Sequence, residues 1–76
     1  MTFEEVKEVI VDTISCDESL VTLEADLADD IGIDSLDAVE LGMALEEKFG
    51  IKIPDEELAN FKTVKDIVEY IDKINE

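Results

Sequence analysis

Apolar residues recur every three or four positions in separate stretches of the chain, and no stretch shows the strict alternation of a half-buried strand. This spacing places apolar side chains on one face of a helix. We therefore predict helices near residues 2–14, 35–49 and 64–74. The apolar faces of the first and last are Phe3, Val6, Val9, Ile10, Thr13 and Ile14, and Val64, Ile67, Val68, Ile71 and Ile74.

Two places have the spacing of a capping box, in which a hydroxyl and a carboxylate three residues apart each accept a hydrogen bond from a free backbone N–H. Thr2 and Glu5 form one such pair, and Thr63 and Asp66 form the other. These pairs predict that the first and last helices begin beside the two threonines.

Turn residues predict one short helix and one long loop. Gly50 ends the second helix, and Asp55 after Pro54 is a candidate cap for a short helix that runs through Phe61. Residues 16–34 form a long polar connection, with a helical turn expected near residues 26–31. We expect its isolated apolar residues to hold it on the core, and these are Leu20, Val21, Leu23, Leu27 and Ile31.

The length of 76 residues is that of one compact domain, so we expect residues 1–76 to form a single unit. A hydrophobic content of 46% is enough for a core despite the high charge. We predict an all-α fold, a small antiparallel four-helix bundle with three longer helices and one short one. The long loop would join the first two helices.

The surface charge restricts the partners. The chain has 22 acidic residues against six basic ones, all lysine, for a formal net charge of -16. This charge disfavours nucleic acid and anionic membranes, and it favours proteins with basic patches. No leader segment opens the chain and no apolar run is long enough to span a bilayer. We expect a cytoplasmic monomer that does not insert into membranes.

Catalytic and metal-binding residue sets are missing from the sequence. There is no histidine and therefore no Ser-His or Cys-His pair, and the lone Cys16 excludes an internal disulfide and a cysteine-based zinc site. Carboxylates cluster in residues 26–37, but a calcium loop centred on Gly32 would place Leu27 at its first ligand position. We predict no catalytic residue and no defined metal site, while loose divalent-cation binding that relieves charge repulsion stays an alternative.

The predicted helix at 35–49 carries two apolar stripes. The first stripe is Ala38, Leu41, Leu45 and Phe49, and the almost opposite second stripe is Leu36, Val39 and Met43. Acidic residues flank the second stripe, and these are Asp37, Glu40, Glu46 and Glu47. One stripe must face the core. The other either packs under the long loop or forms a partner-docking surface, and periodicity alone leaves both open.

Asp34, Ser35 and Leu36 stand at the start of this helix. Aspartate and serine are common helix caps, and Asp34 is a candidate for that role. A hydroxyl in the first helical turn also has a chemical use, because a phosphate esterified there would meet free N–H groups and the positive end of the helix dipole. The nearby acidic residues oppose this attraction, so such a phosphate would stay solvated.

The sequence around these residues resembles the motif of a known protein family. Acyl carrier proteins have an attachment motif with Asp-Ser-Leu at its core, which this chain resembles in the run Asp30-Ile31-Gly32-Ile33-Asp34-Ser35-Leu36-Asp37. The similarity continues through residues 39–41, 43–47, 53–57, 63–64 and 70–71. It covers essentially the whole chain and is strongest from Leu27 to Glu57, whereas residues 18–24 match only loosely.

The resemblance implies a role for particular residues. In this family a separate phosphopantetheinyl transferase moves 4′-phosphopantetheine from coenzyme A to the motif serine, which would be Ser35, and Asp34 would help the transferase and its metal reach the hydroxyl. Partner enzymes would bind Leu36, Asp37, Val39, Glu40, Met43, Glu46 and Glu47. The acyl chain would be sheltered in a cavity lined by Leu41, Leu45 and Phe49.

The resemblance also implies a function. The chain would be a carrier and not an enzyme, and it would deliver a growing fatty acyl thioester between fatty acid biosynthesis enzymes. Its partners would be the transferase, the synthesis enzymes and acyltransferases with basic docking patches. A polyketide, aminoacyl or D-alanyl cargo is the alternative, although the Asp-Ser-Leu context and the Glu-Glu pairs favour fatty acid synthesis.

Overall fold

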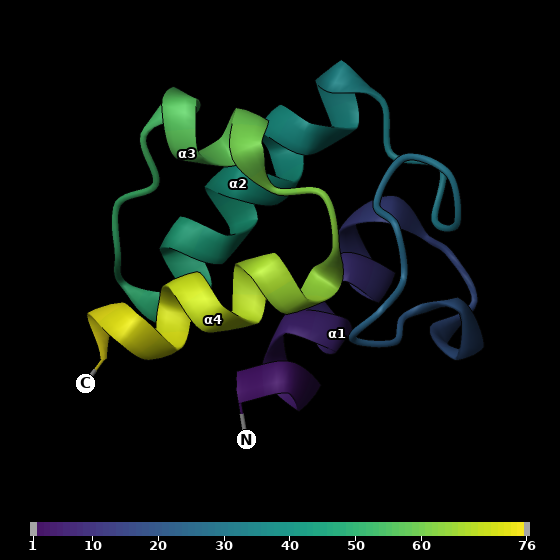
Figure 1. The fold of residues 1–76 in the computed structure, drawn as a ribbon, viewed down its shortest axis with the longest axis horizontal. Coiled ribbons are helices and arrows are strands. Elements are labelled where there is room, and N and C mark those ends of the chain that lie inside the picture. Colours follow the sequence, from purple (N-terminus) through teal and green to yellow (C-terminus); the bar gives the residue numbers. More distant parts are fainter. Residues whose placement is uncertain (1, 76) are drawn as a thin grey trace.

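A computed structural model describes residues 2–75, and its regular elements are helical (Figure 1). Four α-helices follow one another along the chain: α1 (Thr2–Ile14), α2 (Ser35–Phe49), α3 (Asp55–Asn60) and α4 (Val64–Ile74). A short 3-10 helix, η1 (Glu18–Leu20), lies in the long loop and was not predicted. The all-α fold with three longer helices and one short one is confirmed.

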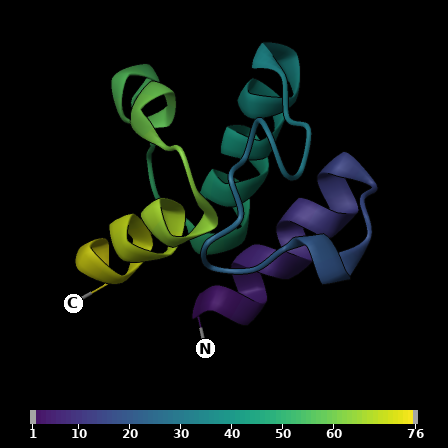
Figure 2. The same ribbon diagram turned by 45° about the vertical axis from the view of Figure 1, so that its right-hand side comes forward.

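The two other longer helices, α2 and α4, both pack against α1, and the short helix lies to one side. α1 contacts both α2 and α4, whereas α3 packs chiefly against α2. Figures 1 and 2 show α3 on one side of α2 and the long loop of residues 15–34 on the other. This arrangement leaves α3 joined to the rest of the molecule by connections at both of its ends and by its contact with α2.

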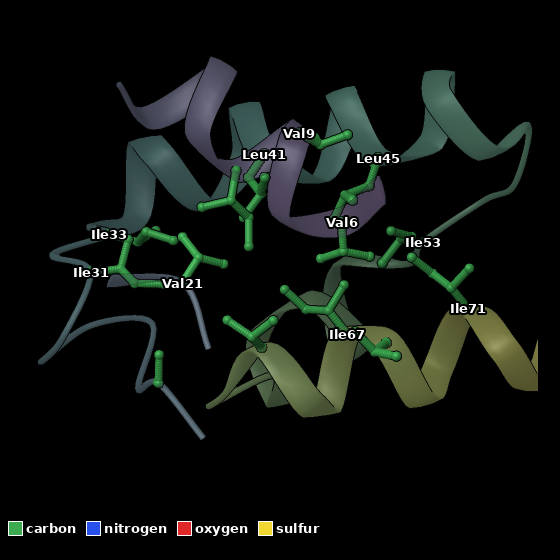
Figure 3. Packing of buried hydrophobic residues seen from close by; sticks show 14 residues of the cluster. Val6, Val9, Val21, Ile31, Ile33, Leu41, Leu45, Ile53, Ile67 and Ile71 are labelled. Carbon is green, nitrogen blue, oxygen red and sulfur yellow. The ribbon is translucent and has the colours of Figure 1, made fainter. Parts of the chain in front are cut away.

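The core lies between α1, α2 and α4. Figure 3 shows that Val6, Leu45, Ile67 and Ile71 from these three helices point toward one another, and each is at most 1% exposed. Among residues 2–75, none of the buried side chains is polar or charged. The core is therefore held by apolar burial alone, at about 25 cal/mol per Å² removed from water.

The loop of residues 15–34 is held by some of the predicted apolar residues and not by others. Val21 and Ile31 are buried, and Leu27 is half-buried. Leu20 and Leu23 were expected to hold the loop but are 45% and 41% exposed, so for these two residues the prediction was wrong. Backbone hydrogen bonds also hold the loop in place, since Leu27 N–H donates to Lys62 O at 2.8 Å.

The helix ends follow one predicted capping box but not the other. At α4 the box is present, since the Thr63 hydroxyl accepts from Asp66 N–H and the Asp66 carboxylate accepts from Thr63 N–H. Thr2 is already inside α1, and its hydroxyl donates to Asp72 of α4. That hydroxyl ties the first helix to the last instead of capping its own helix, so this prediction was wrong.

The ends of α2 and α3 differ in how they are closed. Gly50 follows α2 in the left-handed region at φ 64°, and its N–H donates to Glu46 O, as expected for a glycine after a helix. At α3 the capping position is Pro54 with no side-chain hydrogen bond, and Asp55 is the first helical residue. The prediction of Asp55 as the cap was therefore wrong, and α3 ends at Asn60 before the predicted Phe61.

Candidate functional site

Ser35 is the first residue of α2 and is exposed. Gly32, at φ 83°, turns the chain just before it, in a left-handed conformation that suits glycine. Asp34 then caps the helix, because its Oδ1 accepts a hydrogen bond from Asp37 N–H at 2.9 Å. The role of Asp34 as a helix cap is confirmed. The cap fixes the direction of α2 and leaves the Ser35 side chain at its edge.

The Ser35 hydroxyl is not committed to a structural role. Within residues 2–75, no hydrogen bond joins it to another protein group. The backbone N–H groups of the first turn of a 15-residue helix lie beside it, and they favour negative charge. The carboxylates of Asp34 and Asp37 oppose that charge. An exposed hydroxyl in this setting fits esterification to a solvated phosphate.

A pocket of about 390 Å³ opens beside Ser35. Its wall comes from the end of the long loop, α2, α3 and the first part of α4, and most of the residues that form it are apolar. They are Leu27, Ala28, Ile33, Asp34, Ser35, Ala38, Val39, Leu41, Asp55, Leu58, Ala59, Phe61 and Ile67. The volume lies in the lower part of the range for small-molecule sites. A flexible apolar group tethered to Ser35 could enter it.

This pocket contains only one of the three residues expected to line an acyl cavity. Leu41 lies in its wall, but Leu45 and Phe49 do not. Leu45 is fully buried in the core. Phe49 ends α2, about 20 Å along the helix from Ser35 at 1.5 Å per residue. Leu45 and Phe49 lie outside this pocket, which follows the first half of α2 only, so their role in sheltering an acyl chain stays a prediction.

Several pocket residues were missed by the sequence reasoning. They come from the loop and from α3, and they are Leu27, Ala28, Ile33, Leu58, Ala59 and Phe61. Periodicity on α2 alone could not reveal them, because they lie on the pocket only after folding. Leu58 carried a usable signal, since it is the one large apolar residue in α3.

The second stripe of α2 faces solvent. Leu36 is 77% exposed, Val39 51% and Met43 63%. The alternative that this stripe packs under the long loop is therefore wrong. Glu40 and Glu47 beside it are also exposed. The stripe forms an apolar surface with acidic residues around it, the composition expected of a site that binds a basic partner protein.

Glu46 differs from the other acidic residues of α2. It is half-buried, and its Oε2 accepts a hydrogen bond from Ile53 N–H at 2.7 Å. Its backbone O also accepts from Ile51 N–H. Glu46 therefore holds the connection between α2 and α3 in place, a structural role that sequence reasoning missed.

Comparison with known proteins identifies the family. A family described as "Phosphopantetheine attachment site" matches residues 4–71. An acyl carrier protein of Helicobacter hepaticus is 56% identical over 93% of both chains, and one of Clostridium perfringens is 54% identical over 91% of both. A solved structure of a proposed acyl carrier protein from Mycobacterium tuberculosis superposes with a TM-score of 0.90 at 30% identity, covering 97% of this chain and 99% of that one.

The fold and the matched region thus define a phosphopantetheine-attachment domain. More particularly, the chain belongs to the acyl carrier protein family, whose prosthetic group is 4′-phosphopantetheine and whose members carry acyl groups.

The described part of the chain lacks two kinds of feature. No helix among residues 2–75 is long and apolar enough to cross a membrane. No group of three or more cysteine or carboxylate side chains in that same region is arranged to hold a metal ion.

Proposed function

We propose that Ser35 is the attachment point of 4′-phosphopantetheine and that this chain carries fatty acyl groups between the enzymes of fatty acid synthesis. The observation that carries the proposal is the position of Ser35, an exposed hydroxyl that stands at the start of α2 and on the wall of an apolar pocket. Membership of the acyl carrier family supports the attachment, and the acidic docking surface supports enzyme partners.

Attachment needs little from the chain itself. The Ser35 oxygen displaces the adenosine bisphosphate part of coenzyme A at phosphorus, forms a phosphodiester and loses its proton to the transferase. Asp34 keeps the first turn of α2 fixed through its hydrogen bond to Asp37 N–H, so the hydroxyl is held in one place. Once attached, the group supplies a thiol that holds the acyl chain as a thioester.

The pocket would shelter the acyl part of the cargo. Ala38 and Leu41 line it from α2, Leu58 lines it from α3, and Ile67 lines it from α4. Each methylene removed from water contributes about 0.8 kcal/mol, so a chain of several methylenes would favour the pocket over solvent. The thioester would then be exposed to water mainly while a partner enzyme is bound.

Partner enzymes would bind the exposed stripe of α2. Leu36, Val39 and Met43 supply apolar contact, while Glu40 and Glu47 attract basic residues of the partner. The partners would be the phosphopantetheinyl transferase, the synthesis enzymes and acyltransferases. The chain would be a substrate for them and not a catalyst, acting as a cytoplasmic monomer with residues 1–76 as one domain.

The cargo can be tested by mixing the carrier that bears phosphopantetheine with purified enzymes of different pathways. A malonyl transferase and a ketoacyl synthase of bacterial fatty acid synthesis should add an acyl group, seen as a mass increase on the protein. Aminoacyl-adenylating and D-alanyl-adenylating enzymes should add nothing under the same conditions. Loading by either adenylating enzyme, with no elongation by the synthase, would overturn the fatty acyl assignment in favour of a D-alanyl or aminoacyl cargo.

A further inference from the structure

α3 is attached to the molecule by few interactions of its own. It has six residues, none of which is buried, and its first turn has no side-chain cap. Leu58 is half-buried, and it is the only large apolar side chain that α3 contributes. The same side chain is part of the pocket wall. Where Leu58 lies thus determines both how α3 packs and how much space the pocket has.

Leu58 packs directly over Gly42 of α2. Gly42 is buried in the middle of that helix. A methyl group on its Cα would lie 3.1 Å from Leu58 Cδ2, 3.2 Å from Cδ1 and 3.7 Å from Cγ. The first two distances are shorter than ordinary van der Waals contact between carbons. Leu58 therefore occupies the space that a side chain at position 42 would fill.

Glycine is a poor choice at this position by local criteria. In a helix interior it destabilises relative to alanine, because the unfolded chain has more freedom to lose. The backbone here is helical, so no special conformation requires glycine. The close approach of Leu58 is the feature of the structure that favours glycine, since a Cβ here would force Leu58 to move by a few tenths of an ångström.

We propose that Gly42 is a positioning residue that sets the depth of the cargo pocket by giving Leu58 a place on α2. This rests on the proposed function, in which the pocket receives the acyl chain. A larger residue at position 42 displaces Leu58 from α2, and the adjoining pocket is the free space into which it moves. The pocket then accommodates a shorter chain.

The test uses the whole protein loaded with butanoyl, octanoyl or dodecanoyl thioesters, with aminolysis by hydroxylamine as the measure of shelter. Gly42→Ala should leave the butanoyl rate unchanged and raise the octanoyl and dodecanoyl rates about fourfold for each methylene that is no longer buried. In the Leu58→Ala background the same substitution should have no effect on the dependence of the rate on chain length. Leu20→Ala, an exposed leucine in η1, is the control for leucine truncation.

A second measurement does not depend on the attached phosphopantetheine. In urea unfolding of the unloaded protein, Gly42→Ala should raise the midpoint in the Leu58→Ala background, where its helix propensity is realised without a clash. It should raise the midpoint less, or lower it, when Leu58 is present. Additive midpoints, or equal rate increases for all three thioesters, would overturn the proposal. Failure of the folded parent and of every variant to accept phosphopantetheine would instead overturn the proposed function.

Discussion

Two leucines of α2 allow docking to be separated from folding with the same substitution. Leu36 is 77% exposed and Leu45 is fully buried. Leu45→Ala should cost about 2–5 kcal/mol, as truncations in a packed core do. A 76-residue domain has a total stability of about 4–11 kcal/mol at 0.05–0.15 kcal/mol per residue. The Leu45 variant should therefore be close to unfolding, whereas Leu36→Ala should change stability by less than about 0.5 kcal/mol.

The cost of Leu36→Ala should appear when a partner binds. Full burial of a leucine side chain contributes about 1.5–3 kcal/mol. Since 77% of this side chain is exposed in the free carrier, docking could bury about three-quarters of that surface. The loss is then about 1–2 kcal/mol, which corresponds to binding about 5- to 30-fold weaker.

The assay is the KM of the unmodified protein as a substrate of a phosphopantetheinyl transferase, with urea unfolding of the same samples. Leu36→Ala should raise KM by the factor above while its unfolding midpoint stays near that of the parent. Leu20→Ala, an exposed leucine outside α2, should change neither. An unchanged KM for Leu36→Ala, or a midpoint as low as that of Leu45→Ala, would refute the assignment of the second stripe to docking.

Three further outcomes are expected. Glu40→Lys should raise the transferase KM at low salt but not at high salt, whereas Glu69→Lys on α4 should leave the KM unchanged at both. An equal rise in KM for both variants would mean that only the net charge of the carrier matters. The pKa of Asp66 lies below its ordinary value of 3.8, chiefly because Lys62 N–H donates to its carboxylate. Because the pKa of Asp66 is lower in the folded state than in the unfolded state, its carboxylate stabilises the fold at pH values above the unfolded-state pKa. This stabilisation is lost as the pH falls through the folded-state pKa. Asp66→Ala should thus be about 1 kcal/mol less stable than the parent at neutral pH, as for the loss of a capping interaction. Urea unfolding should show this stability difference narrowing below pH 3.8, and a constant difference would contradict an ionised Asp66 carboxylate in the capping box. Magnesium chloride should raise the melting temperature more than sodium chloride at equal ionic strength, because divalent cations would relieve the repulsion within a net charge of -16. Superimposable melting curves in the two salts would contradict this specific effect of magnesium.

Local sequence signals predicted the helices well. The spacing of apolar residues located α1, α2 and α4, and Gly50 marked the end of α2. Thr63 and Asp66 formed their capping box as expected. These features depend on residues within one or two turns of each other, so the sequence contains what is needed to predict them.

Features that depend on distant contacts were not predictable in this way. Thr2 has the same spacing to Glu5 as Thr63 has to Asp66, yet its hydroxyl bonds to Asp72, 70 positions away. Glu46 has the pattern of a solvated carboxylate, but the turn after α2 brings Ile53 N–H to it. The contact of Gly42 with Leu58, and with it the shape of the pocket, appears only when α3 packs on α2.

The attachment of the arm to Ser35 is tested most directly by intact mass after incubation with coenzyme A and a broad-specificity phosphopantetheinyl transferase. Ser35→Ala is compared with Ser19→Ala, because Ser19 is also exposed near the start of a helical segment beside a capping aspartate, Asp17. The parent and Ser19→Ala should each gain the mass of one phosphopantetheine, and Ser35→Ala should gain none. Full modification of Ser35→Ala, or no modification of a folded parent, would contradict the account.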